Sequence, residues 1–192
     1  MKLLLVIDRI AFVLFYRSRY QRMFAHYGRN IRWGRDFRRY VIPRSVRISC
    51  PEKIHIGDGC RFDEGVYLQC HNDGDGIEIG AGTRINAHTH VLAYAKVTIG
   101  SHVLVAPVSL VASGDHGFDQ IDTPIMQQRY NSSGAIEIAD GAWIAQGAKI
   151  LGGSRVGRNS VVAAGAVVKG KFFDYSMLAG VPARCVRVIA GS

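Results

Sequence analysis

The sequence predicts an all-β chain wound into a parallel β-solenoid with three sides to each coil. Aliphatic residues recur at every sixth position between residues 138 and 168. One helix face cannot collect these positions because six is not a multiple of 3.6, whereas a strand places residues i and i+4 on one side. The residue four places after each aliphatic position is small: Ala142, Ala148, Ser154, Ser160 and Ala166. A short strand and a tight turn, repeated every six residues, form one side of a triangular coil.

The same register extends toward the N-terminus. Counting the C-terminal six, it covers fifteen inward positions: Ile56, Phe62, Leu68, Ile79, Ile85, Val91, Ile99, Val105, Val111, Ile138, Ile144, Ile150, Val156, Val162 and Val168. Since three positions make one coil, the pattern predicts about five coils within residues 51–170.

The segments on either side of the solenoid have a different composition. Residues 1–15 are mostly apolar, but the run is too short to cross a bilayer, so we expect a helix that packs on the solenoid or lies on a membrane surface. The aromatic and arginine-rich residues that follow are expected to complete a cap over residues 1–50. Residues 171–192 form a short C-terminal extension.

The net charge of +9 is concentrated in the first 50 residues, which contain twelve Lys or Arg against two Asp. An apolar helix with nearby basic residues is typical of peripheral membrane binding, and an anionic surface or a phosphorylated substrate suits this charge. No helix-turn-helix, zinc-finger or RNP pattern accompanies it, so nucleic acid is not an expected partner. The four cysteines show no CxxC or zinc spacing, which indicates reduced thiols in a cytoplasmic protein. Membrane contact of the N-terminal segment would place the protein at the inner face of the membrane.

The repeat is interrupted at residues 117–137, which we expect to form a loop on one face of the solenoid. His116 is the last residue before this interruption, and strand alternation points it out of the coil. An imidazole at the floor of such a cleft can act as a general base near neutral pH.

The repeat [LIV]-[GAED]-x-x-[STAV]-x resembles the hexapeptide acyltransferase family. Residues 180–184 (Gly-Val-Pro-Ala-Arg) resemble the C-terminal signature of its sugar and polysaccharide acetyltransferases, and residues 115–119 look like the O-acetyltransferase branch of capsule and lipopolysaccharide biosynthesis. The resemblance implies a left-handed parallel β-helix, a homotrimer and acetyl-coenzyme A as co-substrate, with no metal.

The resemblance also implies roles for individual residues. His116 matches the base that deprotonates the acceptor hydroxyl, and Asn86 matches an amide that holds the acceptor or the developing oxyanion. We expect His88, Tyr94 and Asp119 to line the acceptor site, although galactoside-type members have an acidic residue in place of Tyr94. Seven residues match the coenzyme-binding positions: Trp143, Ala145, Ala163, Ala164, Lys169, Arg184 and Arg187.

The sequence therefore predicts an acetyl-coenzyme A-dependent O-acetyltransferase that acts on a sugar hydroxyl of a cell-surface polysaccharide or its lipid-linked precursor. Three alternatives stay open. The first is N-acetylation of an amino-sugar nucleotide. The second is a trimer similar to carbonic anhydrase, with zinc on His88, His90 and His116. The third is a non-catalytic scaffold at the membrane.

Overall fold

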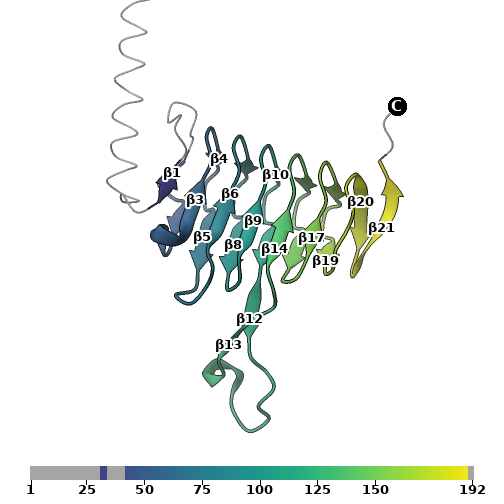
Figure 1. Ribbon diagram of the computed structural model, residues 1–192. Helices are drawn as coiled ribbons and strands as arrows, with labels where there is room; N and C mark the ends of the chain where they lie inside the picture. The colour runs from purple at the N-terminus through teal and green to yellow at the C-terminus, as the bar shows by residue number, and fades with distance from the viewer. Residues whose placement is uncertain (1–30, 34–41, 190–192) are drawn as a thin grey trace, which may run out of the picture.

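The computed structural model describes residues 31–33 and 42–189 of the chain. The expected N-terminal helix, most of the basic cap and the last three residues lie outside these ranges. Within them the chain winds as a parallel solenoid whose strands stack into three sheets, here called faces A, B and C (Figure 1). No helix in the described ranges is long and apolar enough to cross a membrane.

Each face is a ladder of short strands with one strand from each coil. Face A contains β1 (Arg32–Trp33), β3 (Ile54–Ile56), β6 (Ile77–Ile79), β9 (Val97–Ile99), β14 (Ile136–Ile138) and β17 (Arg155–Val156). Face B contains β4 (Arg61–Phe62), β7 (Arg84–Ile85), β10 (Leu104–Val105), β15 (Trp143–Ile144), β18 (Val161–Val162), β20 (Ser176–Gly180) and the antiparallel β21 (Ala183–Val188). Face C contains β2 (Arg47–Ile48), β5 (Tyr67–Cys70), β8 (His90–Ala93), β11 (Leu110–Ala112), β16 (Lys149–Leu151) and β19 (Val167–Val168).

Three shorter elements lie outside the faces. They are the 3-10 turns η2 (Pro51–Lys53) and η3 (Ile125–Gln127), and a two-stranded antiparallel sheet of β12 (Gly114–His116) and β13 (Tyr130–Ser132). We call residues 114–132 the hairpin. Figure 1 shows the hairpin projecting from the middle of the solenoid.

The core confirms the six-residue register. All fifteen predicted inward residues are at most 2% exposed, and so are the five small residues that follow them four places later. Full burial of an aliphatic side chain stabilises a fold by about 1.5–3 kcal/mol. The aliphatic column inside the three faces is therefore the main stabilising feature of the solenoid.

The predicted number of coils was too low. Six parallel strands stack on each face, and face B has a seventh, antiparallel strand, so there are six to seven coils rather than five. The additional strands are β1 and β2, which lie within the first 50 residues, and β20, which lies after residue 170. Insertions at the corners also change the spacing: Leu68 and Val91, neighbours on face C, are 23 positions apart. The predicted register spans this insertion, since both residues are among the fifteen inward positions, so the missed coils come from the two ends of the solenoid.

Candidate functional site

The hairpin leaves the solenoid at the corner that follows face C. Its register places His116 directly opposite Tyr130. At its base, the backbone N–H of Ser133 donates to the carbonyl of Ser113 at 2.8 Å, which brings the two ends of the excursion together. His116 is therefore carried by an ordered antiparallel pair outside the core, whereas strand alternation placed it on the outside of a coil.

The tip of the hairpin is organised around Gln128, which is 6% exposed. Its Nε2 donates to the carbonyls of Gln120 at 2.9 Å and Thr123 at 2.8 Å, and its Oε1 accepts the N–H of Gln120 at 3.1 Å. The apolar side chains of Phe118 and Ile121 remain 80% and 98% exposed on this frame. The tip thus has internal order and an unburied apolar surface.

Four aromatic rings connect the hairpin to the solenoid. The ring of Tyr130 lies between His116, with centroids 4.2 Å apart, and Tyr94, with centroids 5.1 Å apart. Tyr94 in turn stacks on His71 at 4.9 Å. We call these four residues the aromatic column. A Cβ at Gly114 would lie 2.5 Å from the Cβ of Tyr94, so the start of the hairpin must be glycine for Tyr94 to occupy its place.

A buried hydroxyl fixes the backbone beneath Tyr94. Ser113 is fully buried, and its Oγ accepts the N–H groups of Tyr94 at 2.9 Å and Ala95 at 3.0 Å. The same hydroxyl lies 2.8 Å from the carbonyl of Ala95, to which it donates. Ser113 therefore joins the start of the hairpin to the preceding coil and fixes the backbone that carries the Tyr94 ring.

Two groups of the aromatic column, the His116 imidazole and the Tyr94 phenol, are partly shielded from solvent. The Nδ1 atom of His116 is buried and has no hydrogen-bond partner among the described residues. Burial raises the pKa of the Tyr94 phenol above its usual value of 10, and the neighbouring Tyr130 and Asp115 raise it further. With Nδ1 covered, Nε2 is the nitrogen of His116 that a substrate hydroxyl can reach.

The predicted site residues fall on two corners of the solenoid. Tyr94 contacts the hairpin that carries His116 and Asp119, at the corner after face C. Asn86 instead follows β7, at the corner between faces B and C, as do Ala145 after β15 and Ala163 after β18. The width of face C separates the two groups within one chain.

Most of the other predicted coenzyme residues accompany the alanine corner. Trp143, 46% exposed on face B, pairs in register with Leu104. Ala164 is exposed at the same corner, and Arg184 and Arg187 are exposed on β21 of the same sheet. Lys169 does not join them. It follows β19, and its Nζ donates to the carbonyl of Gly152 at 2.7 Å.

Two predicted histidines have local structural roles. His88 adopts a left-handed backbone (φ 57°) at an exposed turn, where its ring covers Gly65. His90 stacks on Tyr67 with centroids 4.9 Å apart, and its Nε2 lies 3.1 Å from Oε1 of Gln69. Burial lowers the pKa of His90. Within residues 31–33 and 42–189, no three His, Cys, Asp or Glu side chains are grouped so that they could hold a metal ion.

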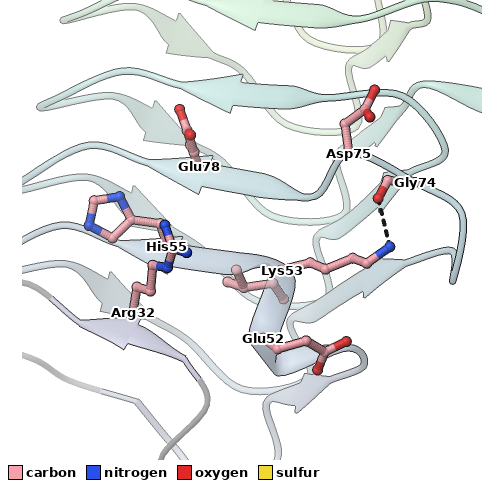
Figure 2. A pocket seen from close by; sticks show the side chains of 8 residues that line it. Arg32, Glu52, Lys53, His55, Gly74, Asp75 and Glu78 are labelled. Atoms are coloured by element: carbon pink, nitrogen blue, oxygen red, sulfur yellow. Dashed lines mark hydrogen bonds between the residues drawn. The ribbon is translucent and has the colours of Figure 1, made fainter.

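A separate depression of about 270 Å³ lies at the N-terminal end of face A. Figure 2 shows Arg32, Lys53 and His55 interspersed with acidic side chains around it. The Lys53 ammonium donates to the carbonyl of Gly74 at 2.9 Å and is thereby held against the backbone. None of the predicted site residues lines this depression, and its mixed charges offer no nucleophile–base pair. The hairpin is the stronger candidate site.

The fold can now be compared with known proteins. A crystal structure of a hexapeptide-repeat-containing acetyltransferase from Vibrio cholerae, complexed with acetyl-coenzyme A, matches 71% of this chain and 72% of its own, with a TM-score of 0.61 and 30% identity. The chain belongs to the hexapeptide-repeat transferases. Residues 135–170 also match the model described as bacterial transferase hexapeptide (six repeats).

Two curated relatives support this family assignment. A Mycobacterium tuberculosis protein provisionally named an acetyltransferase is 30% identical over 156 residues, or 80% of this chain. The match covers 48% of that protein, so the hexapeptide-repeat chain spans about half of its length. WbbJ of Escherichia coli K12, whose name assigns it provisionally to lipopolysaccharide O-acetylation, is 28% identical over 155 residues, covering 75% of this chain and 78% of its own.

Proposed function

We propose that this hexapeptide-repeat transferase uses acetyl-coenzyme A to O-acetylate a sugar hydroxyl of a cell-surface polysaccharide or its precursor. The observation that carries the proposal is the placement of His116. Its imidazole is held outside the core by an ordered hairpin, with Nδ1 covered and Nε2 left for a substrate. General bases need this combination of fixed position and access.

The proposed reaction is a direct transfer. Nε2 of His116 accepts the proton of the acceptor hydroxyl while the hydroxyl oxygen forms a bond to the thioester carbonyl carbon. The C–S bond then breaks, and the departing sulfur takes the proton back from the imidazolium. The products are an acetyl ester and coenzyme A. Base assistance of this kind contributes about 10²- to 10⁴-fold to the rate. An amide such as that of Asn86 would stabilise the oxyanion that develops on the carbonyl oxygen.

The corner between faces B and C supports the placement of the coenzyme. A Cβ added to Gly147 or Gly165 would meet no atom within 4 Å, so the backbone there borders open space. Ala145 and Ala163 begin these two turns, and their small side chains leave space at the surface for the narrow pantetheine arm. The exposed guanidinium groups of Arg184 and Arg187 supply positive charge for the nucleotide phosphates. Trp143 and Ala164 remain candidates for the same contact, whereas Lys169 follows face C and its predicted contact with the coenzyme stays a prediction.

A complete site would require a second copy of the chain. His116 and Asn86 lie at different corners, so we propose that the corner carrying His116 meets the corner carrying Asn86 of a neighbour. Repeating this heterologous contact three times closes a ring. Leu104 and Trp143, which are 37% and 46% exposed and adjacent in register, offer an apolar surface for the contact.

The N-terminal charge suggests where the acceptor is held. Twelve basic residues within the first 50 would favour a phosphate-linked glycan at an anionic membrane surface on the cytoplasmic side. Most of these residues lie outside the described ranges. Removal of residues 1–20 should therefore lower activity on a lipid-linked acceptor more than activity on a free glycoside. Equal activities on both acceptors would remove the support for membrane contact.

The decisive test is His116→Ala, assayed by release of the coenzyme A thiol from acetyl-coenzyme A. The acceptor panel contains methyl hexopyranosides, a lipid-linked glycan and amino-sugar nucleotides. We expect a loss of about 10²- to 10⁴-fold with the hydroxyl acceptors. His55→Ala, an exposed histidine on face A, is the matched control and should retain full activity. Retention of activity in His116→Ala would refute the assignment, and preference for the amino-sugar nucleotides would change the proposal to N-acetylation.

A further inference from the structure

We infer that Tyr130 is a positioning residue that orients the His116 imidazole and stabilises its protonated form through the face of its ring. This inference rests on the proposed function because it concerns the residue assigned there as the general base.

The rings of Tyr130 and His116 are in close contact. The centroids of the Tyr130 and His116 rings lie 4.2 Å apart with an interplanar angle of 44°, the shortest ring separation in the aromatic column. Register fixes this contact because the two residues are direct partners in the antiparallel sheet. Cross-strand neighbours on one face of such a pair have their Cβ atoms within about 5.5 Å of each other, which keeps two flat rings in contact.

The Nδ1 atom of His116 has no hydrogen-bond partner among the described residues. A neutral imidazole that uses Nε2 as the base carries its proton on Nδ1. In His116 this atom is buried without an acceptor, whereas general-base histidines usually have a carboxylate or carbonyl at this position. The Tyr130 ring is in contact with the imidazole at a tilt of 44°, and the face of an aromatic ring is electron-rich. Such a face attracts a cation whose charge lies within about 6 Å of the ring centroid.

Two rings on the solenoid, those of Tyr94 and His71, support the Tyr130 ring. The Tyr130 ring contacts Tyr94 at 5.1 Å with an interplanar angle of 28° and His71 at 5.6 Å, and these two rings stack on each other. Ser113 fixes the Tyr94 backbone from inside the solenoid. Tyr130 therefore cannot move away from His116 toward the solenoid without displacing Tyr94.

Other charged and titratable groups around His116 must be considered. Asp115 lies beside it on β12, Asp119 follows in the hairpin, and Arg129 is next to Tyr130. Tyr94 and His71 complete the set on the solenoid side. Asp115 and Asp119 are exposed, so solvent weakens their effect on the imidazole. The Tyr130 ring is distinguished from these groups by direct contact.

The experiment follows protonation of His116 directly and needs no acceptor. The full chain is labelled with ¹³C at the histidine Cε1 atoms and titrated by NMR, and the His116 signal is identified by its absence in His116→Gln. Loss of a group that stabilises the imidazolium moves the titration midpoint to lower pH. In Tyr130→Leu we expect the His116 midpoint to fall by about 0.5–1 pH unit. Tyr130→Phe, which keeps the aromatic face, should leave it within about 0.2 units.

Tyr67→Leu is the matched control because Tyr67 stacks on His90 and lies outside the aromatic column. It should move the His90 signal and leave the His116 signal unchanged. An unmoved His116 midpoint in Tyr130→Leu would overturn the inference, and an equal shift in Tyr130→Phe would transfer the effect from the ring to the hydroxyl. Activity of His116→Ala is measured separately. If that variant is active while Tyr130→Leu shifts the midpoint, the proposed function falls and the ring contact stands.

Discussion

Replacing Ser113 with Ala should destabilise the chain by removing one oxygen that serves two backbone donors. The Oγ of Ser113 accepts the N–H groups of Tyr94 and Ala95, and the described residues offer these donors no other acceptor. An orphaned buried donor costs about 1–3 kcal/mol. Because Tyr94 and Ala95 are half-buried, each orphaned donor should cost about 1 kcal/mol, at the lower end of this range. For the two donors together we expect a loss of about 2 kcal/mol in the free energy of unfolding.

Ser109→Ala is the matched control. Ser109 is also buried, but its hydroxyl only donates, to the carbonyls of Ala106 and Ala145. Ala106 still accepts from Thr89, and Ala145 still accepts from the N–H of Ala148, so no group is orphaned. We expect a cost of about 0.5–1 kcal/mol. Urea unfolding at one fixed protein concentration compares the two variants. Equal losses would refute the reasoning.

Two further predictions concern ionisation. Burial raises the pKa of Tyr94, so its contribution to stability is complete below pH 10 and is lost as the pH rises through the folded-state value. Tyr94→Phe should therefore flatten the decline of the unfolding free energy at alkaline pH, and an unchanged slope would contradict this. Burial also raises the pKa of Cys60 to about 11 and that of Cys70 to about 12. At pH 8 these thiols should react with Ellman's reagent only on unfolding, whereas Cys185→Ser should remove one fast-reacting equivalent.

The repeating core could be predicted from the sequence because burial there depends on one regular spacing. Within each coil every sixth residue fills a narrow column, and all fifteen of the predicted inward residues, fourteen aliphatic and one phenylalanine, are buried. The number of coils could not be obtained in the same way, since β1 and β2 are two-residue strands in an arginine-rich segment. Many of the predicted strands also have two residues, but Trp33 of β1 and Ile48 of β2 are 15 residues apart and Ile48 is 8 residues before Ile56. Neither spacing is a multiple of six, so the register did not reach them.

The candidate site was harder to predict because its contacts cross the aperiodic segment. Tyr130 is 14 residues from His116, and antiparallel pairing of β12 with β13 brings them together. His71 and Tyr94 belong to different coils, whose separation of 23 residues reflects an insertion in one of the turns. His116 just before the interruption and Tyr130 within it were visible in the sequence, but the sequence alone did not supply the register that joins them.

The closed base of the hairpin has a consequence for divergence among relatives. Since the Ser133 N–H to Ser113 carbonyl bond brings the two ends of the excursion together at one corner, and β14 then pairs with β9, the length of the excursion does not alter the stacking on either side. Loops of different length and composition could therefore be exchanged at this corner while the solenoid stays the same. A graft between positions 113 and 133 should therefore leave the solenoid on either side unchanged.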